Sequence, residues 1–368
     1  MPTEYNESLM KIIIFAGGTG KRFWPASRKH TPKQFLPVID DKPLIRLKYD
    51  YLRLGYPPED IFLDTGRQYE KEVRQILPEL PTENFIFEPD MRDTGPAIAY
   101  AATYVARRFP DASVSLQWSD HYIKKPTVFI HALQEAEKYI RQDPKMVIIC
   151  EQPRFASPHR GYVKFGRKLK SLDVTDQLVL SEFVRFVEKP TLEVAQQYLQ
   201  SGDYAWNLGY FVAPIQFILD KYAQFAPHIY QTVQKIADQD FAGSAQTEFS
   251  QLEKNSFDYL IAENLNPDET RVINTNMGWY DVGEWISLKE TLEKDTDDTV
   301  THGNVVDVDS KDSLIYNYDD QKLVATINLK EMIVVNTPDV VAIFHKDDND
   351  KIKQFLNKLE NPEHEKYL

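Results

Sequence analysis

The first half of the chain alternates strand-like and helix-like segments, and this alternation limits the folds open to it. Short apolar runs at Lys11–Ala16, Val114–Trp118 and Met146–Cys150 have the length and composition of buried strands. Between them, the helical spacing of apolar residues over 98–105 predicts a helix that Thr94 caps. Such alternation predicts an α/β fold with a mainly parallel sheet covered by helices on both faces. In these sheets, ligands bind beyond the carboxyl ends of the strands.

The pattern changes at the charged stretch Lys294–Asp298. Beyond it, short strand-like runs recur at intervals of about ten residues, at Asn304–Val308, Leu314–Tyr316, Leu323–Ile327, Ile333–Val335 and Val340–Phe344. Lys351–Leu359 has the pattern of a final helix. We therefore predict a large α/β domain at 1–295 and a small β-rich domain with a terminal helix at 296–368. The short runs are candidates for the coils of a β-solenoid, but their repeat alone does not establish one.

Charge and cysteine content exclude several classes of function. The chain has 43 Lys and Arg against 56 Asp and Glu, a net charge of −13, and so lacks the basic balance that nucleic acids and anionic membranes require. Its one cysteine, Cys150, ends an apolar run and reads as a core thiol, as expected in a reducing compartment. Met1–Met10 lacks a signal-peptide pattern, and no apolar run approaches the roughly 20 residues that span a bilayer. We expect a cytoplasmic protein.

Glycines follow the first predicted strand in the run Gly17-Gly18-Thr19-Gly20-Lys21-Arg22. Consecutive glycines at a strand end let backbone N–H groups converge on an anion. A P-loop is excluded because its spacing of glycines is absent. A dinucleotide-binding fingerprint is excluded because Phe23 stands where its third glycine belongs and because prolines interrupt the helix that must follow.

Cations gather after these glycines, although the whole chain is acidic. Between residues 21 and 33 there is no acid, and the cations are Lys21, Arg22, Arg28, Lys29 and Lys33. Arginine binds phosphate through paired hydrogen bonds, and lysine binds it as a point charge. The run is therefore typical of an extended loop that wraps a triphosphate.

The stretch from Phe15 to Leu36 resembles the loop of bacterial mannose-1-phosphate guanylyltransferases, and its Pro-Lys-Gln-Phe-Leu ending points to the guanylyl branch of the sugar-nucleotide pyrophosphorylases. The resemblance continues through most of the chain. It implies a Rossmann-like, GT-A-like nucleotidyltransferase domain and a β-helix-like C-terminal domain. It also implies Mg²⁺-assisted in-line transfer of GMP from GTP to α-D-mannose 1-phosphate, without a covalent intermediate.

The resemblance assigns roles to individual residues. Asp120, in Ser119-Asp120-His121, and Asp281, in Asp281-Val282-Gly283, become the metal ligands, and two carboxylates with phosphate oxygens and waters suit octahedral Mg²⁺. These two acids, Arg22 and Lys33 are the expected catalytic residues. The expected nucleotide-binding residues are Gly17, Gly18, Thr19, Gly20, Lys21, Arg22, Lys33, Glu88, Thr94, Pro96 and Asp120. The expected sugar-phosphate residues are Gly161, Glu188, Lys189, Asn207 and Gly209.

The chain departs from the family pattern at several of these segments. Trp118 and Ser119 replace Pro-Ala before the first acid, and Leu208 replaces Ser beside Asn207. Asp93 and Gly95 alter the base-binding segment and leave the base preference open, and Arg160 departs from the pattern beside Gly161.

Three alternatives stay open at this point. The first is a related nucleotidyltransferase with another hexose 1-phosphate or nucleotide. The second is a non-catalytic regulatory subunit that binds sugar nucleotides, which the retained acids disfavour. The third is an NAD-dependent oxidoreductase, which the glycine and proline pattern disfavours. The C-terminal module is a candidate for homodimer formation. Because the chain ends at Leu368, without the isomerase domain of some relatives, we expect a single activity.

Overall fold

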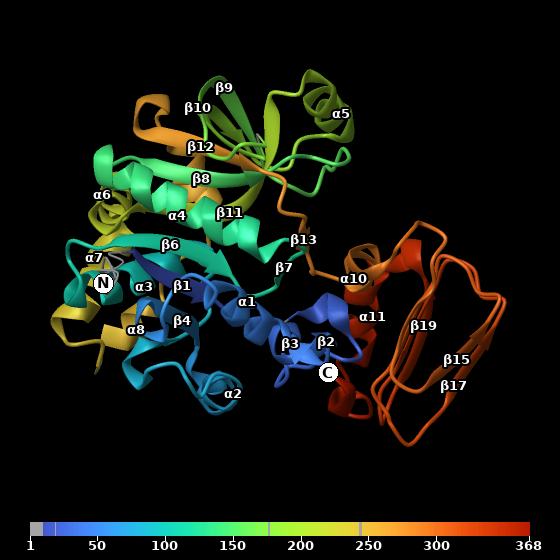
Figure 1. The fold of residues 1–368 in the computed structure, drawn as a ribbon. Coiled ribbons are helices and arrows are strands. Elements are labelled where there is room, and N and C mark those ends of the chain that lie inside the picture. Colours follow the sequence, from blue (N-terminus) through green and yellow to red (C-terminus); the bar gives the residue numbers. More distant parts are fainter. Residues whose placement is uncertain (1–9, 19, 176, 243–244) are drawn as a thin grey trace, which may run out of the picture. The chain divides into compact units, whose positions relative to one another are not determined.

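The computed structural model describes residues 10–18, 20–175, 177–242 and 245–368 (Figure 1). Its contacts divide the chain into two compact units, which are described here one at a time. The first unit contains Tyr49–Ser119 and Ile123–Trp279, together with the strand that leads to Gly17. The second contains Gly18–Lys48, Asp120–Tyr122 and Tyr280–Leu368.

The first unit is built on one mixed sheet of nine strands (Figure 1). In spatial order the strands are β5 (Phe85–Glu88), β4 (Ile61–Gly66), β1 (Met10–Phe15), β6 (Ser113–Trp118), β11 (Tyr204–Pro214), β8 (Met146–Glu151), β12 (Thr270–Thr275), β10 (Leu178–Val187) and β9 (Tyr162–Ser171). The four strands from β5 to β6 are parallel, as are β8 and β12. β11 runs antiparallel between β6 and β8, and β9 and β10 form an antiparallel edge. The carboxyl ends of β1, β4 and β5 therefore lie at one edge of the sheet.

Helices cover both faces of this sheet, as predicted. The helices α3 (Thr94–Arg108), α6 (Ile215–Phe225), α7 (Pro227–Asp238) and α9 (Phe257–Leu260) share one core with the strands. That core includes Cys150, which is fully buried. α4 (Pro126–Gln142) packs on β8, β11 and β12. Neighbouring residues of β11 serve different faces: Phe211 belongs to the α3 core, whereas the Tyr210 ring lies 5.5 Å from that of Phe129 on α4.

The remaining helices of this unit are α2 (Glu70–Ile76), α5 (Leu192–Ser201) and α8 (Ala245–Phe249). One predicted cap is wrong. Asp93, rather than Thr94, caps α3, and its carboxylate accepts the N–H of Thr94 at 2.7 Å. Asp93 has a φ of +67° and a ψ of 175°, a strained combination that residues other than glycine rarely adopt. Thr94 is the first residue of the helix, and its hydroxyl is used elsewhere.

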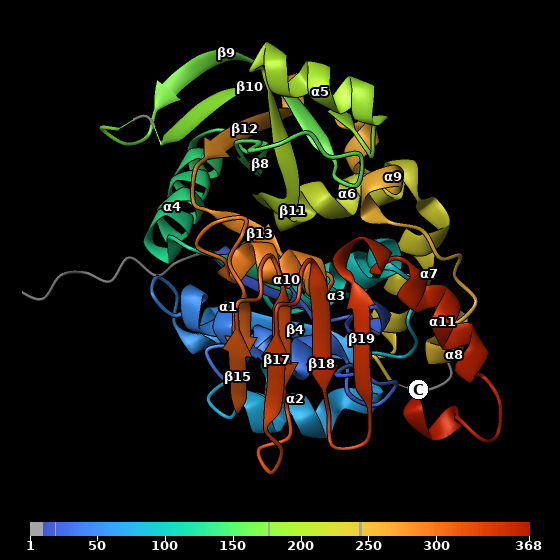
Figure 2. The ribbon, with the colours of Figure 1, turned by 90° about the vertical axis from the view of Figure 1, so that its right-hand side faces the viewer.

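The second unit holds the C-terminal β-strands. They are β14 (Val300–His302), β15 (Val305–Val308), β16 (Leu314–Asn317), β17 (Val324–Ile327), β18 (Met332–Asn336) and β19 (Val341–His345). The sequence predicted all of these except β14. β16 and β18 pair in parallel with Leu314 opposite Ile333, and β15 and β17 pair with Val305 opposite Val324. Both pairings join residues 19 positions apart, so the chain winds as a parallel β-solenoid (Figure 2).

Polar contacts between coils support the solenoid. Asn336 donates from Nδ2 to Oδ1 of Asn317, 19 positions away, at 2.7 Å, and Asn317 donates to the carbonyl of Asn304, 13 positions away, at 3.0 Å. Thr326 donates to Asp307 one coil away. These bonds satisfy polar groups that the stacked coils would otherwise bury without partners.

The other elements of this unit include α10 (Trp285–Leu292), α11 (Lys351–Leu359), β2 (Pro37–Ile39) and β3 (Lys42–Pro43). α11 has the predicted bounds. Because residues 18–48 and 120–122 group with the C-terminal region, the compact units differ from the sequential domains 1–295 and 296–368, which stay a prediction. α1 (Leu44–Leu52), β7 (His121–Ile123) and β13 (Trp279–Asp281) contain residues of both units.

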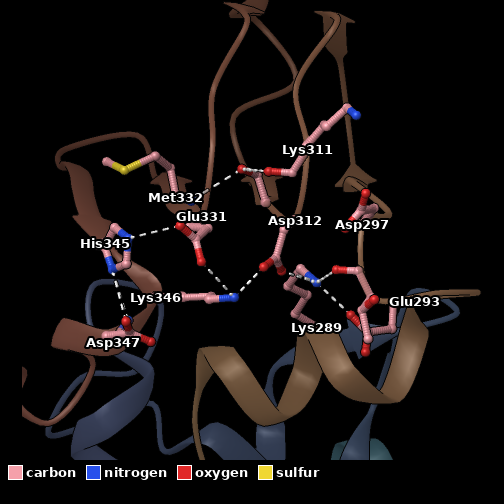
Figure 3. A network of polar contacts seen from close by, with 12 residues as sticks. Lys289, Glu293, Asp297, Lys311, Asp312, Glu331, Met332, His345, Lys346 and Asp347 are labelled. Carbon is pink, nitrogen blue, oxygen red and sulfur yellow. Dashed lines mark hydrogen bonds and ion pairs between the residues drawn. The ribbon is translucent and has the colours of Figure 1, made fainter.

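An ion-pair network ties α10 to the solenoid (Figure 3). Lys289 is almost fully buried, and its ammonium lies 2.5 Å from Glu293 and 2.7 Å from Asp312. Lys346 pairs with the same Asp312 and with Glu331. Burial alone would lower the pKa of Lys289, but Asp312 and Glu293 outweigh it, so the pKa is raised. Lys289 therefore stays charged and holds the two carboxylates together.

Candidate active site

Residues 20–36 of the second unit form an irregular loop with short 3₁₀ turns at Lys21–Phe23 and Lys33–Phe35. Gly20 has a φ of +62°, and an ideal Cβ there would lie 2.8 Å from Cβ of Lys33. A side chain at position 20 would therefore displace Lys33. The expected absence of a regular helix after the glycines is confirmed. Thr19 lies outside the described residues.

Two tryptophan contacts hold this loop in its unit. The ring of Phe23 packs 4.7 Å from that of Trp285, and Trp285 donates from Nε1 to the carbonyl of Trp24 at 2.9 Å. Trp285 is fully buried, as its predicted core role requires. The loop is thus packed and hydrogen-bonded directly after Lys21 and Arg22.

Lys33 binds the first predicted acid directly. Its ammonium lies 2.7 Å from Oδ2 of Asp120 and donates to the carbonyl of Val282 at 3.1 Å. Burial would raise the pKa of Asp120, but Lys33 and His121 outweigh it and hold that pKa well below its usual value. Asp120 is consequently ionised at neutral pH. Burial lowers the pKa of His121 to about 4, so His121 is neutral there.

The second acid lies beside the first. The N–H of Val282 donates to the carbonyl of Asp120 at 3.2 Å, which places Asp281 next to it along the chain. An ideal Cβ on Gly283 would lie 3.2 Å from Oδ1 of Asp281 and 3.3 Å from Nη2 of Arg22. Asp281 and Arg22 therefore flank the same glycine. The second unit thus brings together all four predicted catalytic residues, Arg22, Lys33, Asp120 and Asp281.

Sequence reasoning missed Glu284 in this group. Its Oε2 lies 2.9 Å from Nη1 of Arg22 and also accepts from Nδ2 of Asn349 at 2.9 Å. Because Asn349 holds the carboxylate of Glu284 in place, this carboxylate orients the guanidinium of Arg22. The sequence feature that could have identified Glu284 is its position directly after Asp281-Val282-Gly283.

These donors fit a hard divalent cation. Asp120 and Asp281 offer ionisable oxygens from adjacent segments, which Mg²⁺ prefers, and Mg²⁺ normally keeps several non-protein ligands. Among the described residues, no group of three or more His, Cys, Asp or Glu side chains is arranged to hold a metal. The protein itself would therefore supply the two predicted carboxylates.

Four of the predicted nucleotide-binding residues, Gly17, Glu88, Thr94 and Pro96, belong to the first unit. Gly17 follows β1, and Glu88 ends β5. Pro96 is buried in the first turn of α3. Glu88 is also buried, and burial raises its pKa to about 7. Asp64, which the sequence did not single out, is buried as well, and burial, together with the charge of Glu88, raises its pKa well above the usual value.

The predicted sugar residues also converge in the first unit. Glu188 and Lys189 form an ion pair of 2.6 Å, and an ideal Cβ on Gly161 would lie 2.4 Å from Oε2 of Glu188. Gly209 donates its N–H to Oδ1 of Asn207 at 3.0 Å. The sequence-predicted set Gly161, Glu188, Lys189, Asn207 and Gly209 is therefore held together. Lys189 has a φ of +45°, a strained conformation for lysine.

Two departures from the family pattern pack against this set. Trp118 donates from Nε1 to the carbonyl of Gly209 at 3.1 Å, and its ring lies 5.3 Å from Phe15. The guanidinium of Arg160 lies over the ring of Trp206 at 4.1 Å from its centroid. Trp118 therefore links the end of β1, which precedes Gly17, to the sugar segment.

Comparison with known proteins identifies the family of the chain. The sequence model of the family described as nucleotidyl transferase matches residues 11–298. That of the mannoseP isomerase/GMP-like beta-helix domain matches residues 303–359, the solenoid region. The α/β region is thus of the nucleotidyl transferase class.

Individual relatives show which family of nucleotidyl transferases the chain belongs to. The chain is 31% identical to mannose-1-phosphate guanylyltransferase 2 of Escherichia coli O157:H7, over 97% of this chain and 74% of that protein. It is 32% identical to the xanthan biosynthesis protein XanB of Xanthomonas campestris, over 95% and 73%. The chain therefore belongs to the mannose-1-phosphate guanylyltransferase family of nucleotidyl transferases and is an enzyme.

A solved structure shares the fold. The crystal structure of mannose-1-phosphate geranyltransferase from Thermus thermophilus superposes with a TM-score of 0.85 at 24% identity. The match covers 96% of this chain and 99% of the other. Across the described residues, no helix is long and apolar enough to cross a membrane.

Proposed function

We propose that the enzyme transfers GMP from GTP to α-D-mannose 1-phosphate, giving GDP-mannose and pyrophosphate. The observation that carries this proposal is the convergence of Arg22, Lys33, Asp120 and Asp281 in one compact unit. Paired cations and carboxylates are what transfer between phosphate groups requires. The names of relatives that are 31–32% identical over 94–97% of the chain supply the substrates.

In this mechanism the protein positions the reactants and neutralises charge. The loop N–H groups, Lys21 and Arg22 bind the β- and γ-phosphates, which leave as pyrophosphate. Lys33 neutralises charge on the nucleotide phosphates. A phosphate oxygen of the sugar substrate attacks the α-phosphorus in line, so no enzyme nucleophile is required. Mg²⁺, bound by Asp120 and Asp281, would supply further charge neutralisation at the α-phosphate.

The first unit would bind the base and the sugar. Glu88, Thr94 and Pro96 belong to the segment that would bind the base. Asn207 and Glu188 would bind hexose hydroxyls, and Lys189 would neutralise the sugar phosphate. Its ion pair with Glu188 keeps the pKa of Lys189 raised, so this cation is charged over the physiological pH range.

One observation favours a second candidate, the same reaction with another nucleotide or hexose 1-phosphate. Asp93 and Gly95 alter the base segment, and Asp93 is engaged in capping α3. A regulatory subunit without catalysis is less favoured, because Asp120, Asp281 and Arg22 are all present, and binding a sugar nucleotide alone needs no pair of metal-binding acids.

A substrate panel tests the proposal. Product is measured with Mg²⁺ and inorganic pyrophosphatase for each pairing of GTP, ATP, UTP or CTP with mannose, glucose or glucosamine 1-phosphate. The proposal expects GTP with mannose 1-phosphate to be preferred. Preference for another pair would keep the reaction but assign different substrates to the enzyme. Folded protein that turns over no pair would favour the regulatory subunit.

Location and assembly are part of the same proposal. We propose a cytoplasmic enzyme, which the lone buried thiol of Cys150 supports, since such an environment keeps thiols reduced. We also propose that the C-terminal β-region forms a homodimer, which light scattering of the purified protein tests.

A further inference from the structure

A short segment of the first unit, Asn255–Asp258, connects the base segment with the sugar segment. At the base end, Gly95 donates its N–H to the carbonyl of Asn255 at 2.9 Å, and Phe257 donates its N–H to the hydroxyl of Thr94 at 2.9 Å. An ideal Cβ on Gly95 would lie 2.6 Å from that carbonyl oxygen. The departure at Gly95 therefore lets the segment approach the start of α3.

At the sugar end, the same segment contacts Asn207. The Nδ2 of Asn207 donates to Oδ1 of Asp258 at 3.1 Å, while its Oδ1 accepts the N–H of Gly209 at 3.0 Å. Because one amide atom donates and the other accepts, the two bonds fix which way the amide points. On the far side of Gly209, its carbonyl accepts from Trp118 at 3.1 Å. Asn207 is thus held from both ends.

Charged groups surround Asp258. Its pKa is raised to about 6: burial is the largest cause and Glu188 adds to it, whereas Lys189 and the bond from Asn207 oppose the rise. The hydroxyl of Tyr222 on α6 feels the charge of Asp258, and Tyr259 is its neighbour in α9. The predicted sugar site therefore has two carboxyl groups, Asp258 and Glu188, beside the ammonium of Lys189. Carboxylates accept hydrogen bonds from hydroxyls and an ammonium pairs with phosphate, so these groups suit a hydroxyl-rich ligand with one phosphate.

We propose that Asp258 is a positioning residue of the sugar subsite, which orients the Asn207 amide toward the hexose hydroxyls and couples this subsite to the base segment through Asn255–Asp258. This inference rests on the proposed function, because it concerns the hexose half of the product. The nucleotide half does not depend on Asp258. Loss of its carboxylate therefore weakens binding of GDP-mannose and leaves binding of GDP unchanged.

Calorimetric titration of wild type, Asp258→Ala and Asp258→Asn with GDP and with GDP-mannose tests the inference. At pH 7.5, D258A should bind GDP-mannose at least tenfold more weakly and GDP within twofold of wild type. D258N should stay within threefold for both ligands, because its amide oxygen still accepts from Asn207. The matched control is Asp220→Asn, which changes an exposed aspartate on α6 and should match wild type throughout.

The pH dependence gives a readout that a merely structural role would not move. Wild type should lose affinity for GDP-mannose as the pH falls from 7 to 5, because protonation of Asp258 weakens the acceptor. D258N should lose less affinity than wild type over this range, because only the contribution of Glu88 in the base segment remains, and binding of GDP shares that contribution. This comparison holds even where D258A fails to fold. GDP-mannose suits the comparison because both of its phosphates are esterified.

The outcomes separate the two claims. Folded D258A that binds GDP-mannose within twofold of wild type overturns the inference, as does an equal loss for GDP and GDP-mannose. Equal pH dependence in wild type and D258N also overturns it. Wild type that binds GDP but not GDP-mannose contradicts the proposed function and the inference with it.

Discussion

Lys33 places its ammonium 2.7 Å from the carboxylate of Asp120 and 3.1 Å from the carbonyl of Val282, the residue that follows Asp281. One cation from the glycine-rich loop thus contacts both segments that carry the predicted metal ligands. The loop and the two acids are far apart in sequence, yet they form one polar cluster in the second unit. Burial opposes the low pKa of Asp120, and the charge of Lys33 is the largest of the effects that lower it. The contact between the two residues therefore stabilises the ionised carboxylate.

Replacing Asp120 by alanine should lower kcat by at least about a hundredfold, the scale of losing one strong transition-state charge interaction. The measurement is initial-rate kinetics with saturating GTP and mannose 1-phosphate. Asp120→Asn should show a similar loss, because it keeps the shape but removes the charge. Activity within fivefold of wild type would contradict the assignment of Asp120.

Replacing Lys33 by methionine should lower kcat/KM for GTP by about a hundredfold or more, because the stem is kept while the charge near the phosphates is lost. Binding of free mannose 1-phosphate should change little. Lys29→Met, an exposed lysine of the same loop, is the control and should retain most activity. If both variants lose the same fraction of kcat/KM for GTP, the loss reflects a general attraction of GTP to the positively charged loop rather than a specific contact with Lys33.

Replacing Gly209 by alanine should destabilise the protein by about 2–4 kcal/mol, since overpacking and a strained left-handed residue each cost about 1–3 kcal/mol. The new Cβ would lie 2.1 Å from Nε1 of Trp118, and Gly209 has a φ of +70°. Urea unfolding measures the change. The double variant Gly209→Ala with Trp118→Ala should recover no more than the packing part, because the backbone strain remains. Stability equal to wild type in G209A would show that the two residues are not packed together.

Replacing Lys289 by methionine should destabilise the protein by about 1–3 kcal/mol at pH 7, because Asp312 and Glu293 lose their shared cation. The pKa of Asp312 is lowered: burial opposes this shift, and Lys289 and Lys346 outweigh it. A lowered carboxyl pKa contributes stability that is present above the usual value near 4 and is lost as pH falls below it. The difference between wild type and variant should therefore shrink below about pH 4 in thermal unfolding. A constant difference from pH 7 to pH 3 would exclude the ion pairs as its source.

Local patterns predicted much of the fold and site. The glycines, Asp120 and Asp281 stand in short motifs at strand ends, and strand and helix periods extend over neighbouring residues. Asp258 escaped prediction because its partner Asn207 is 51 residues away and no spacing rule connects them. Glu284 acts through a similar long-range contact with Arg22, and neither it nor the buried Asp64 stands out in its own segment. The solenoid period of 19 was hidden because only some stacked positions, such as Val305 with Val324 and Asn317 with Asn336, repeat the same residue.

The most direct test of the central claim is the stoichiometry of the reaction itself. Purified enzyme is incubated with GTP, mannose 1-phosphate and Mg²⁺, and GDP-mannose and pyrophosphate are quantified in the same sample. The account predicts one GDP-mannose for each pyrophosphate and no pyrophosphate without mannose 1-phosphate. Folded enzyme that forms no GDP-mannose, or that releases pyrophosphate without the sugar phosphate, would contradict it.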